Sequence, residues 1–177
     1  MAQIKDSMVR YITQEEIREM TKQICRQIES DYRGKEVVLI CPLKGSVLFC
    51  ADFSRELKLP QQLEFVQLIT RKPEGKHEQG EVTIVKDIST NVMSKHVLIV
   101  EEIIDAGRTL SFLKNRVLAS GPASLKIVTL LDKPARRQIN IKADYIGTTI
   151  EDRYVVGYGL DEDELGRNYP DIYYLKH

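Results

Sequence analysis

The sequence has no tryptophan, only three cysteines and no long apolar run. Its apolar stretches span only a handful of residues, whereas a helix that crosses a bilayer needs about 20 consecutive apolar residues. The charged beginning MAQIKDSMVR also lacks the apolar region that a secretory signal requires. These absences predict a cytoplasmic protein without a membrane partner.

A net charge is missing as well. The 26 Lys and Arg residues equal the 26 Asp and Glu residues in number, so the chain has no surplus of positive charge. Non-specific binding to nucleic acid depends on a basic surface. We therefore expect no nucleic-acid partner, with a local basic patch left open as an alternative.

The three cysteines are Cys25, Cys41 and Cys50. Their spacing matches no metal site, and an odd number suits reduced thiols in a cytosol. Cys41 and Cys50 also lie among apolar residues. We interpret all three as packing residues.

The remaining pattern fits one α/β domain over residues 1–177. The chain is 42% hydrophobic and 29% charged, which is typical of a soluble globular protein. Thr13 and Glu16 form a capping-box pattern at the start of a helix that we expect to stop near Gly34. Further helices are expected at 46–57 and 110–118, and strands at 36–41, 62–69, 82–85, 97–102, 124–131, 143–150 and 154–160. Strands and helices that alternate in this way indicate a largely parallel sheet.

Polar residues gather directly after four of the expected strands. In an open parallel sheet, ligands bind at the carboxyl ends of the strands, so these positions carry the functional signal. The first cluster is Lys44-Gly45, which can offer backbone N–H groups and a cation to a phosphate. An ordinary strand-to-helix turn has the same pattern, so this cluster alone decides nothing.

The second cluster, in VLIVEEIIDAGRTL (97–110), is more specific. Glu101 and Glu102 end a buried strand, where two adjacent carboxylates repel each other unless a cation or a polyhydroxylated ligand lies between them. Residues 105–109 then form a short loop at a helix start, which suits a monophosphate. The alternative is a plain helix start capped by Asp105, but a plain cap does not require two acids.

The third and fourth clusters add groups that can handle a base. Lys133 can donate to a carbonyl oxygen or an anion, and Tyr154 can stack on a planar ring. Asp161 can bind Mg²⁺, and Arg167 can hold a phosphate. Taken singly, Lys133 is equally typical of a solvated turn, and Tyr154 of a strand.

In this order the four clusters resemble those of the hypoxanthine-guanine phosphoribosyltransferases, which belong to the type I purine phosphoribosyltransferase family. The resemblance extends from about Val9 to Tyr174 and is most specific in EEIIDAGRTL (101–110) and YVVGYGLDEDELGR (154–167). The shorter motif LKG (43–45) precedes these two segments, and DK (132–133) lies between them. It implies the type I phosphoribosyltransferase fold, in which a mostly parallel sheet is flanked by helices and a small hood is formed from the chain termini.

The resemblance also implies a role for each matching residue. Phosphoribosyl pyrophosphate would be bound by Lys44, Gly45, Glu101, Glu102, Ala106, Gly107, Arg108, Thr109 and Arg167. The purine would be bound by Lys133 at its 6-oxo group, by Tyr154 through stacking and by the Val155 carbonyl. Asp105 would accept the purine N7 proton, and Mg²⁺ would be held at Glu101, Glu102 and Asp161.

The implied activity is purine salvage. The phosphoribosyl group of phosphoribosyl pyrophosphate would pass to hypoxanthine or guanine, giving IMP or GMP and pyrophosphate. Cations stabilise the leaving charge, a carboxylate withdraws a proton from the nucleophile, and a lid excludes water from the cationic intermediate. The family resemblance further suggests a homo-dimer or homo-tetramer.

Three features depart from the family's usual pattern. Glu102 stands where the family usually has Asp, which lengthens the second acid by one methylene. The loop RKPEGKHEQGE (71–81) is shorter than the family's lid and has no Ser or Tyr, and Ala106 replaces a more common Thr or Ser. The loop puts the rate and the preferred base in question, whereas Ala106 would act through its backbone.

Two alternatives stay open at this point. One is a non-catalytic regulator that keeps the phosphoribosyl-pyrophosphate site and binds RNA or DNA, although Asp105, Lys133 and Tyr154 form a base-handling set that a sensor does not need. The other is a related transferase that prefers xanthine or another base, because xanthine also carries the oxygen that Lys133 would recognise.

Overall fold

The computed structural model describes residues 8–71 and 80–176. The elements in chain order are β1 (Met8–Ile12), α2 (Gln14–Asp31), β2 (Val37–Leu43), α3 (Val47–Glu56), β3 (Gln61–Arg71), β4 (Glu81–Lys86), β5 (His96–Ile104), α4 (Arg108–Leu118), β6 (Ser124–Asp132), η1 (Pro134–Arg136), β7 (Tyr145–Thr149), β8 (Val155–Val156) and β9 (Ile172–Leu175). Thr13 caps α2 in a full capping box with Glu16, as the sequence predicts. Among the described residues, no helix is both long and apolar enough to cross a membrane.

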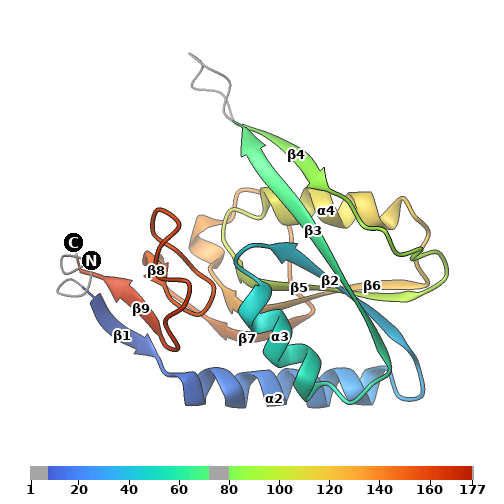
Figure 1. Ribbon diagram of the computed structural model, residues 1–177, viewed down its shortest axis with the longest axis horizontal. Helices are drawn as coiled ribbons and strands as arrows, with labels where there is room; N and C mark the ends of the chain where they lie inside the picture. Colours follow the sequence, from blue (N-terminus) through green and yellow to red (C-terminus); the bar gives the residue numbers. More distant parts are fainter. Residues whose placement is uncertain (1–7, 72–79, 177) are drawn as a thin grey trace.

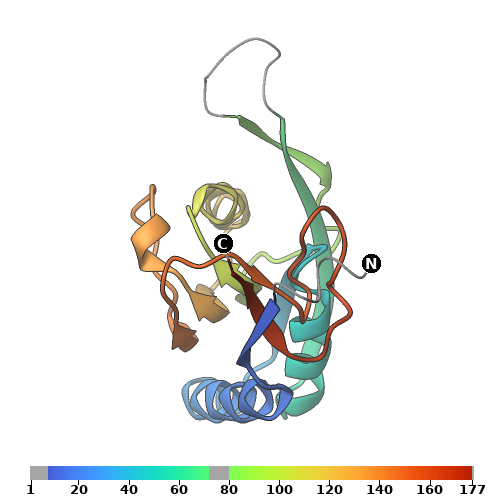
Figure 2. The same cartoon turned by 90° about the vertical axis from the view of Figure 1, so that its left-hand side faces the viewer.

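The main sheet has six strands in the order β4-β3-β2-β5-β6-β7 (Figure 1). Its strands pair in parallel except at the edge, where β3 and β4 form an antiparallel hairpin. This confirms the mostly parallel α/β sheet. The hairpin extends beyond the rest of the sheet (Figure 2).

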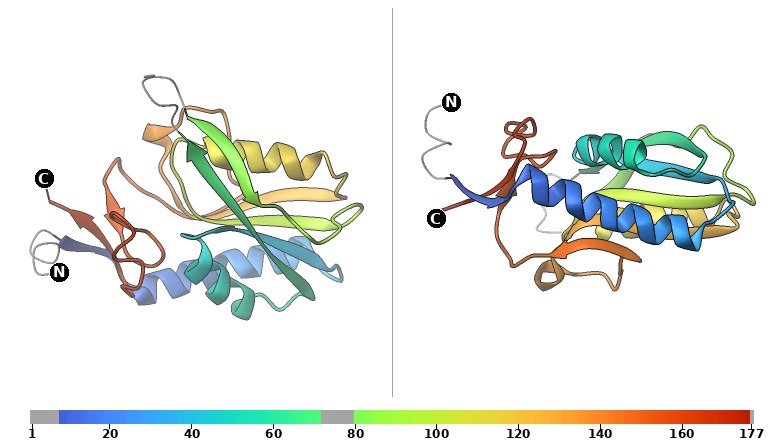
Figure 3. Two further views of the ribbon diagram at one scale, coloured as in Figure 1. Left: turned by 45° about the horizontal axis from the view of Figure 1, so that its top comes forward. Right: turned by 90° about the horizontal axis from the view of Figure 1, so that it is seen from below.

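Alternate residues of the central strand β5 enter two separate cores, because successive side chains of a strand point to opposite faces. Leu98 and Val100 pack into the core under α2 and α3, and these two helices lie side by side (Figure 3). Val97 and Ile99 pack into the core under α4. Both faces of β5 are therefore buried, which explains why its sequence is a continuous apolar run rather than an alternating one.

A second sheet joins the two ends of the described chain in the order β1-β9-β8. β1 pairs antiparallel with β9, and β9 pairs antiparallel with β8. This is the hood of chain termini that the family resemblance implies. The expected strand at 154–160 shrinks to Val155–Val156, because Gly157 turns the chain and its N–H donates to the Leu160 carbonyl.

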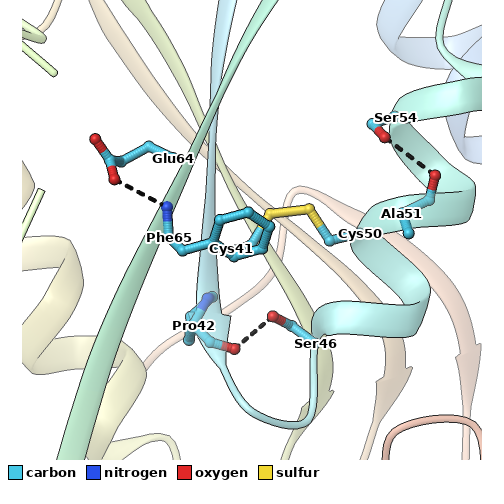
Figure 4. Close-up of a disulfide and its surroundings, with 8 residues drawn as sticks. All are labelled: Cys41, Pro42, Ser46, Cys50, Ala51, Ser54, Glu64 and Phe65. Carbon is cyan, nitrogen blue, oxygen red and sulfur yellow. Dashed lines mark hydrogen bonds between the residues drawn. A yellow bond between two sulfur atoms is a disulfide. The ribbon is translucent and has the colours of Figure 1, made fainter. Parts of the chain in front are cut away.

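The cysteine interpretation is wrong for two of the three residues. Cys41 of β2 and Cys50 of α3 are joined by a disulfide, with their Cα atoms 6.4 Å apart (Figure 4). Cys25 is a free, buried thiol, as expected. A separation of nine residues brings the two sulfurs together only because α3 folds back along β2, and sequence spacing alone does not contain that approach.

Candidate active site

The carboxyl ends of β2, β5 and β6 lie next to one another, because these three strands are neighbours in the parallel sheet. The first and third polar clusters follow β2 and β6 directly, and the second begins inside β5, which continues past Glu101 and Glu102 to Ile104. The fold brings the three clusters to one edge, as the sequence predicts. The fourth cluster begins in the hood, where β8 leads into the turns of 157–171. Side-chain contacts between the clusters join all four into one site.

The first loop is pressed against the acid pair. The Leu43–Lys44 peptide bond is cis, and Gly45 lies so close to β5 that a Cβ on it would come within 1.8 Å of Glu102 Oε1. A side chain at position 45 would therefore require the Glu102 carboxylate to move. Lys44 points outward, with 57% of its side chain exposed.

The two acids carry raised pKa values. Burial, followed by the charge of Glu102, raises the pKa of Glu101 well above its ordinary value. Burial raises the pKa of Glu102 to about 7, although Arg167 opposes the shift. Glu102 Oε2 is buried and has no hydrogen-bond partner within the described part of the chain. A buried carboxylate oxygen of this kind is stabilised by a cation or a hydroxyl donor.

The loop expected to hold the phosphate lies directly before α4. Gly107, at φ 83°, is the residue that precedes α4, so Asp105 does not cap the helix and the plain-cap alternative is wrong. The N–H groups at a helix start have no partners within the helix and point toward its amino end. Ala106, Gly107, Arg108 and Thr109 supply the N–H groups at this end of α4.

The segment after β6 supports this loop through hydrogen bonds from Arg137 and Gln138. Arg137 Nη1 donates to the Asp105 carbonyl at 2.5 Å, and its Nη2 forms an ion pair with Asp132. Gln138 N donates to the Ala106 carbonyl at 3.0 Å, and Arg108 Nε donates to Gln138 Oε1 at 2.7 Å. Arg137 and Gln138 were not predicted, because nothing local marks two polar residues in a turn as supports of a distant loop.

The base-handling residues meet beside that loop. Lys133 is 6% exposed at its side chain, and its Nζ lies 3.9 Å from Asp105 Oδ1. The same Nζ lies 3.6 Å from Asp152 Oδ1 and donates to the Arg153 carbonyl at 3.1 Å. A lysine buried at this depth and flanked by two carboxylates is not a solvated turn lysine.

The hood supplies the other side of this region. Tyr154 is 46% exposed, and its hydroxyl donates to the Asp161 carbonyl at 3.1 Å. Val155 is buried in β8 opposite Tyr174. Tyr154 therefore keeps much of its surface available, which a purely structural strand aromatic would bury.

Charged residues of the hood reach back to the first loop. Arg167 Nη2 lies 2.9 Å from Asp161 Oδ1 and 3.1 Å from Glu164 Oε2. Lys44 Nζ lies 3.0 Å from the same Glu164 oxygen. Glu164 was not predicted as a site residue, because its partner Lys44 is 120 positions away in the sequence.

One expected part of the site lies outside the described residues. Of the loop 71–81, Arg71 ends β3 and Glu81 begins β4, and residues 72–79 are not described.

These features define a class of protein. The chain belongs to the phosphoribosyl transferase domain family, whose model matches residues 10–163. Individual relatives within this family carry a more specific name. A Staphylococcus aureus (strain Mu50) protein named hypoxanthine-guanine phosphoribosyltransferase is 40% identical over 165 residues, which cover 93% of this chain and 92% of the relative. A Streptococcus thermophilus (strain CNRZ 1066) protein of the same name is 38% identical over 172 residues, covering 97% of this chain and 95% of the relative.

Solved structures of similar proteins support the same family assignment. A hypoxanthine-guanine phosphoribosyltransferase from Bacillus anthracis has a TM-score of 0.87 and 40% sequence identity, covering 96% of this chain and 97% of the other. A hypoxanthine phosphoribosyltransferase from Staphylococcus aureus has a TM-score of 0.91 and 38% identity, covering 97% of this chain and 94% of the other. The chain is therefore a transferase enzyme with the type I phosphoribosyltransferase fold.

Proposed function

We propose that this enzyme serves purine salvage by transferring the phosphoribosyl group of phosphoribosyl pyrophosphate to hypoxanthine and guanine, giving IMP or GMP and pyrophosphate. The observation that carries the proposal is the pair of Lys133 and Asp105, whose charged groups lie 3.9 Å apart. Lys133 also donates to the carbonyl of Arg153, the residue before Tyr154. One donor and one acceptor at this spacing match the 6-oxo and N7 edges of a 6-oxopurine.

In this mechanism Lys133 and Asp105 hold opposite ends of that edge. The Lys133 ammonium donates to the 6-oxo group, which adenine lacks, so the pocket discriminates because adenine offers no acceptor for this hydrogen bond. Asp105 accepts the N7 proton as a ring nitrogen of the base bonds to the anomeric carbon and the bond to pyrophosphate breaks. Tyr154 stacks on the ring, and the Val155 carbonyl meets its far edge.

The sugar phosphate is held by the other clusters. The amides of Ala106, Gly107, Arg108 and Thr109, with the Thr109 hydroxyl, bind the 5′-phosphate, and the open amino end of α4 supports this assignment. Glu101 and Glu102 bind the ribose hydroxyls, while Lys44, Gly45 and Arg167 bind the pyrophosphate. Charge-assisted hydrogen bonds of this kind are the stronger ones available to a protein.

The acid residues also fit Mg²⁺. No group of three or more His, Cys, Asp or Glu side chains able to hold a metal occurs within 8–71 and 80–176, but Mg²⁺ typically takes only one or two carboxylates together with water and substrate phosphates. Glu101 and Glu102, whose Oε2 is unpartnered, would hold one ion, and Asp161 would hold a second. The ions would neutralise charge on the departing pyrophosphate.

The three departures from the family pattern bear on this function. Glu102 reaches Gly45, so its extra methylene is accommodated by a residue without a side chain. Ala106 acts through its backbone amide and is compatible with phosphate binding. Residues 72–79 of the third departure, the loop 71–81, lie outside the described residues.

A panel of bases tests the proposal. With Mg²⁺ and phosphoribosyl pyrophosphate, the purified protein is expected to convert hypoxanthine and guanine to nucleotides and adenine hardly at all, as measured by chromatography of the products. Including xanthine in the panel shows how much nucleotide this third 6-oxopurine gives in comparison with hypoxanthine and guanine. Absence of product from both hypoxanthine and guanine would refute the proposal.

We also propose a single domain over 1–177, an assembly of two or four identical chains, and action in the cytoplasm. Exposed apolar side chains at Val47 and Leu48 of α3 support self-association. Light scattering on the protein as it elutes from a size-exclusion column measures the number of chains.

The Cys41–Cys50 disulfide is unusual for a cytosolic protein. Thiol titration of the unfolded protein tests the bond, because one free thiol means that the disulfide is formed and three that it is not.

A further inference from the structure

The side chain of Glu164 bridges two cations that come from opposite sides of the site. Its Oε2 lies 3.0 Å from Lys44 Nζ, in the loop after β2, and 3.1 Å from Arg167 Nη2, in the hood. These are the two side chains assigned to the pyrophosphate. A single carboxylate oxygen therefore lies between the two cationic groups that the leaving group would need.

The backbone places Glu164 in this position. Its φ is +66°, and that of Asp163 is +49°, a left-handed conformation that non-glycine residues rarely adopt. Three hydrogen bonds hold the turn. Glu164 N donates to Asp161 Oδ2 at 2.9 Å, Glu162 N donates to the Leu165 carbonyl at 3.0 Å, and Leu165 N donates to the Glu162 carbonyl at 2.9 Å. A conformation of this kind persists only where the surroundings determine it.

The contact is also suited to being broken. The side chains of Lys44 and Glu164 are 57% and 63% exposed, so water and ligands reach the ion pair directly. Hydrogen bonds from Lys44 and Arg167 lower the pKa of Glu164, so the carboxylate stays charged at neutral pH. Exposed ion pairs contribute little individually, and an anion of higher charge can displace them.

We propose that Glu164 is an internal competitor for pyrophosphate: its carboxylate occupies Lys44 and Arg167 in the empty site and must leave before the pyrophosphate group binds. The inference rests on the proposed function, which assigns those two cations to pyrophosphate. Glu164 touches the two cations and not the reacting atoms, so it is a positioning residue. Its return to them after transfer lowers the affinity for the product and promotes release.

The variant Glu164→Gln tests this role by removing the charge and keeping the shape. Calorimetric titration with magnesium pyrophosphate is expected to give a dissociation constant lower by about 3- to 10-fold, because two competing exposed ion pairs are lost. The inhibition constant of pyrophosphate as a product should fall by the same factor. Both differences should shrink in about 1 M salt, where exposed charges are screened.

Matched controls lie on the same turn. Glu162→Gln and Asp163→Asn each remove one negative charge, and neither side chain has an ion pair within the part of the chain that the structure describes. Both are expected to change pyrophosphate affinity by less than about twofold. Equal tightening in the controls would mean that net charge alone matters, and would overturn the proposal.

The sign of the effect separates competition from a structural role. If Glu164 served only to order the turn, Glu164→Gln would weaken pyrophosphate binding or leave it unchanged, and either result refutes the proposal. The titration uses no purine, so it is independent of the base panel. A wild-type protein that binds pyrophosphate but makes no nucleotide would refute the proposed function alone, and one that binds no pyrophosphate would refute the competition.

Discussion

Asp105 and Lys133 show how single residues are tuned by their surroundings. Lys133 is buried at the end of β6, whereas the Asp105 side chain, 3.9 Å away, is 48% exposed. The lysine contacts two carboxylates and a backbone carbonyl, which hold its orientation in the empty pocket. A base that enters therefore meets a donor already in place, and little reorganisation is needed on binding.

Replacing Asp105 by Asn should lower turnover by about 100- to 10,000-fold, the range for loss of a general base. Affinity for phosphoribosyl pyrophosphate should stay within about twofold, because the backbone amides of the loop remain. Steady-state kinetics and calorimetry measure the two quantities. Asp152→Asn, which alters the other carboxylate beside Lys133, is the control and should reduce turnover by less than about tenfold. Unchanged turnover in the Asp105 variant would show that the proton goes elsewhere.

At the scale of elements, the side chains of Arg137 and Glu64 fix two loops that form no strand pairing with the main sheet. Arg137 ties the phosphate loop to the segment after β6. Glu64, on β3 and 5% exposed, ties down the chain after β4, since it accepts hydrogen bonds from Lys86 Nζ at 2.8 Å and from Ser89 N and Thr90 N at 2.9 Å. Each supports a loop by satisfying backbone or charged groups that would otherwise lack partners.

The variant Arg137→Met should raise the dissociation constant for phosphoribosyl pyrophosphate by about tenfold. It removes the donor to the Asp105 carbonyl and leaves Asp132 without its cation, at a cost of about 1–3 kcal/mol in stability. Calorimetry and thermal unfolding provide the measurements. Arg136→Met alters a neighbouring exposed arginine and should affect neither quantity strongly. Wild-type affinity in the Arg137 variant would show that the loop is ordered without this support.

Glu64 makes a pH-dependent contribution to stability. Burial alone would raise its pKa, but hydrogen bonds from Lys86, Ser89 and Thr90 outweigh it and lower the pKa well below the ordinary value. A lowered pKa stabilises the fold at pH values above that of the unfolded carboxyl, about 4.3, and this stabilisation is lost as pH falls below it.

Glu64→Gln should therefore reduce the free energy of unfolding at pH 7 by about 2–3 kcal/mol. The difference from wild type should shrink between pH 5 and pH 3, as the native carboxylate loses its advantage. Urea unfolding at several pH values measures this. Glu36→Gln, at an exposed glutamate, is the control and should have little effect at any pH. A difference independent of pH would mean that packing, not charge, accounts for the loss.

At the scale of the whole molecule, the hood closes the described chain end to end. Ile12 of β1 pairs with Ile172 of β9, and both belong to the core under α2 and α3. The strand β9 also holds β8, which carries Val155 and follows Tyr154. The strands β1, β8 and β9 lie together at one end of the molecule (Figure 3), so the last strand links the stability of the fold to the proposed base-binding residues.

Ile172→Ala should lower the free energy of unfolding by about 2–5 kcal/mol, because Ile172 is fully buried at 0% exposure. A loss of this size in a chain of this length lowers Tm by about 5–15 °C. The dissociation constant for hypoxanthine should rise as well, since the hood loosens. Leu165→Ala, at a residue 53% exposed, is the control for Tm. Calorimetry that finds Tm unchanged would exclude Ile172 as the anchor of the hood.

The sequence by itself determined what depends on near neighbours in the chain. The Thr13–Glu16 capping box, the continuous apolar run of β5 and the polar residues that follow β2, β5 and β6 could all be predicted, because helix starts, strand faces and strand ends are local properties. Parallel strands place their carboxyl ends at one edge. Local pattern and this one rule were enough to predict the α/β fold and most candidate site residues.

Tertiary structure decided every feature that joins distant positions. The approach of Glu102 to Gly45, the contact of Lys44 with Glu164, 120 residues away, and the support of Asp105 by Arg137 leave no local trace in the sequence. The same holds for the Cys41–Cys50 disulfide, which the spacing of the cysteines did not indicate. Hydrogen bonds, ion pairs and disulfides form only between atoms a few ångströms apart. Which residues come that close is decided only when the chain folds.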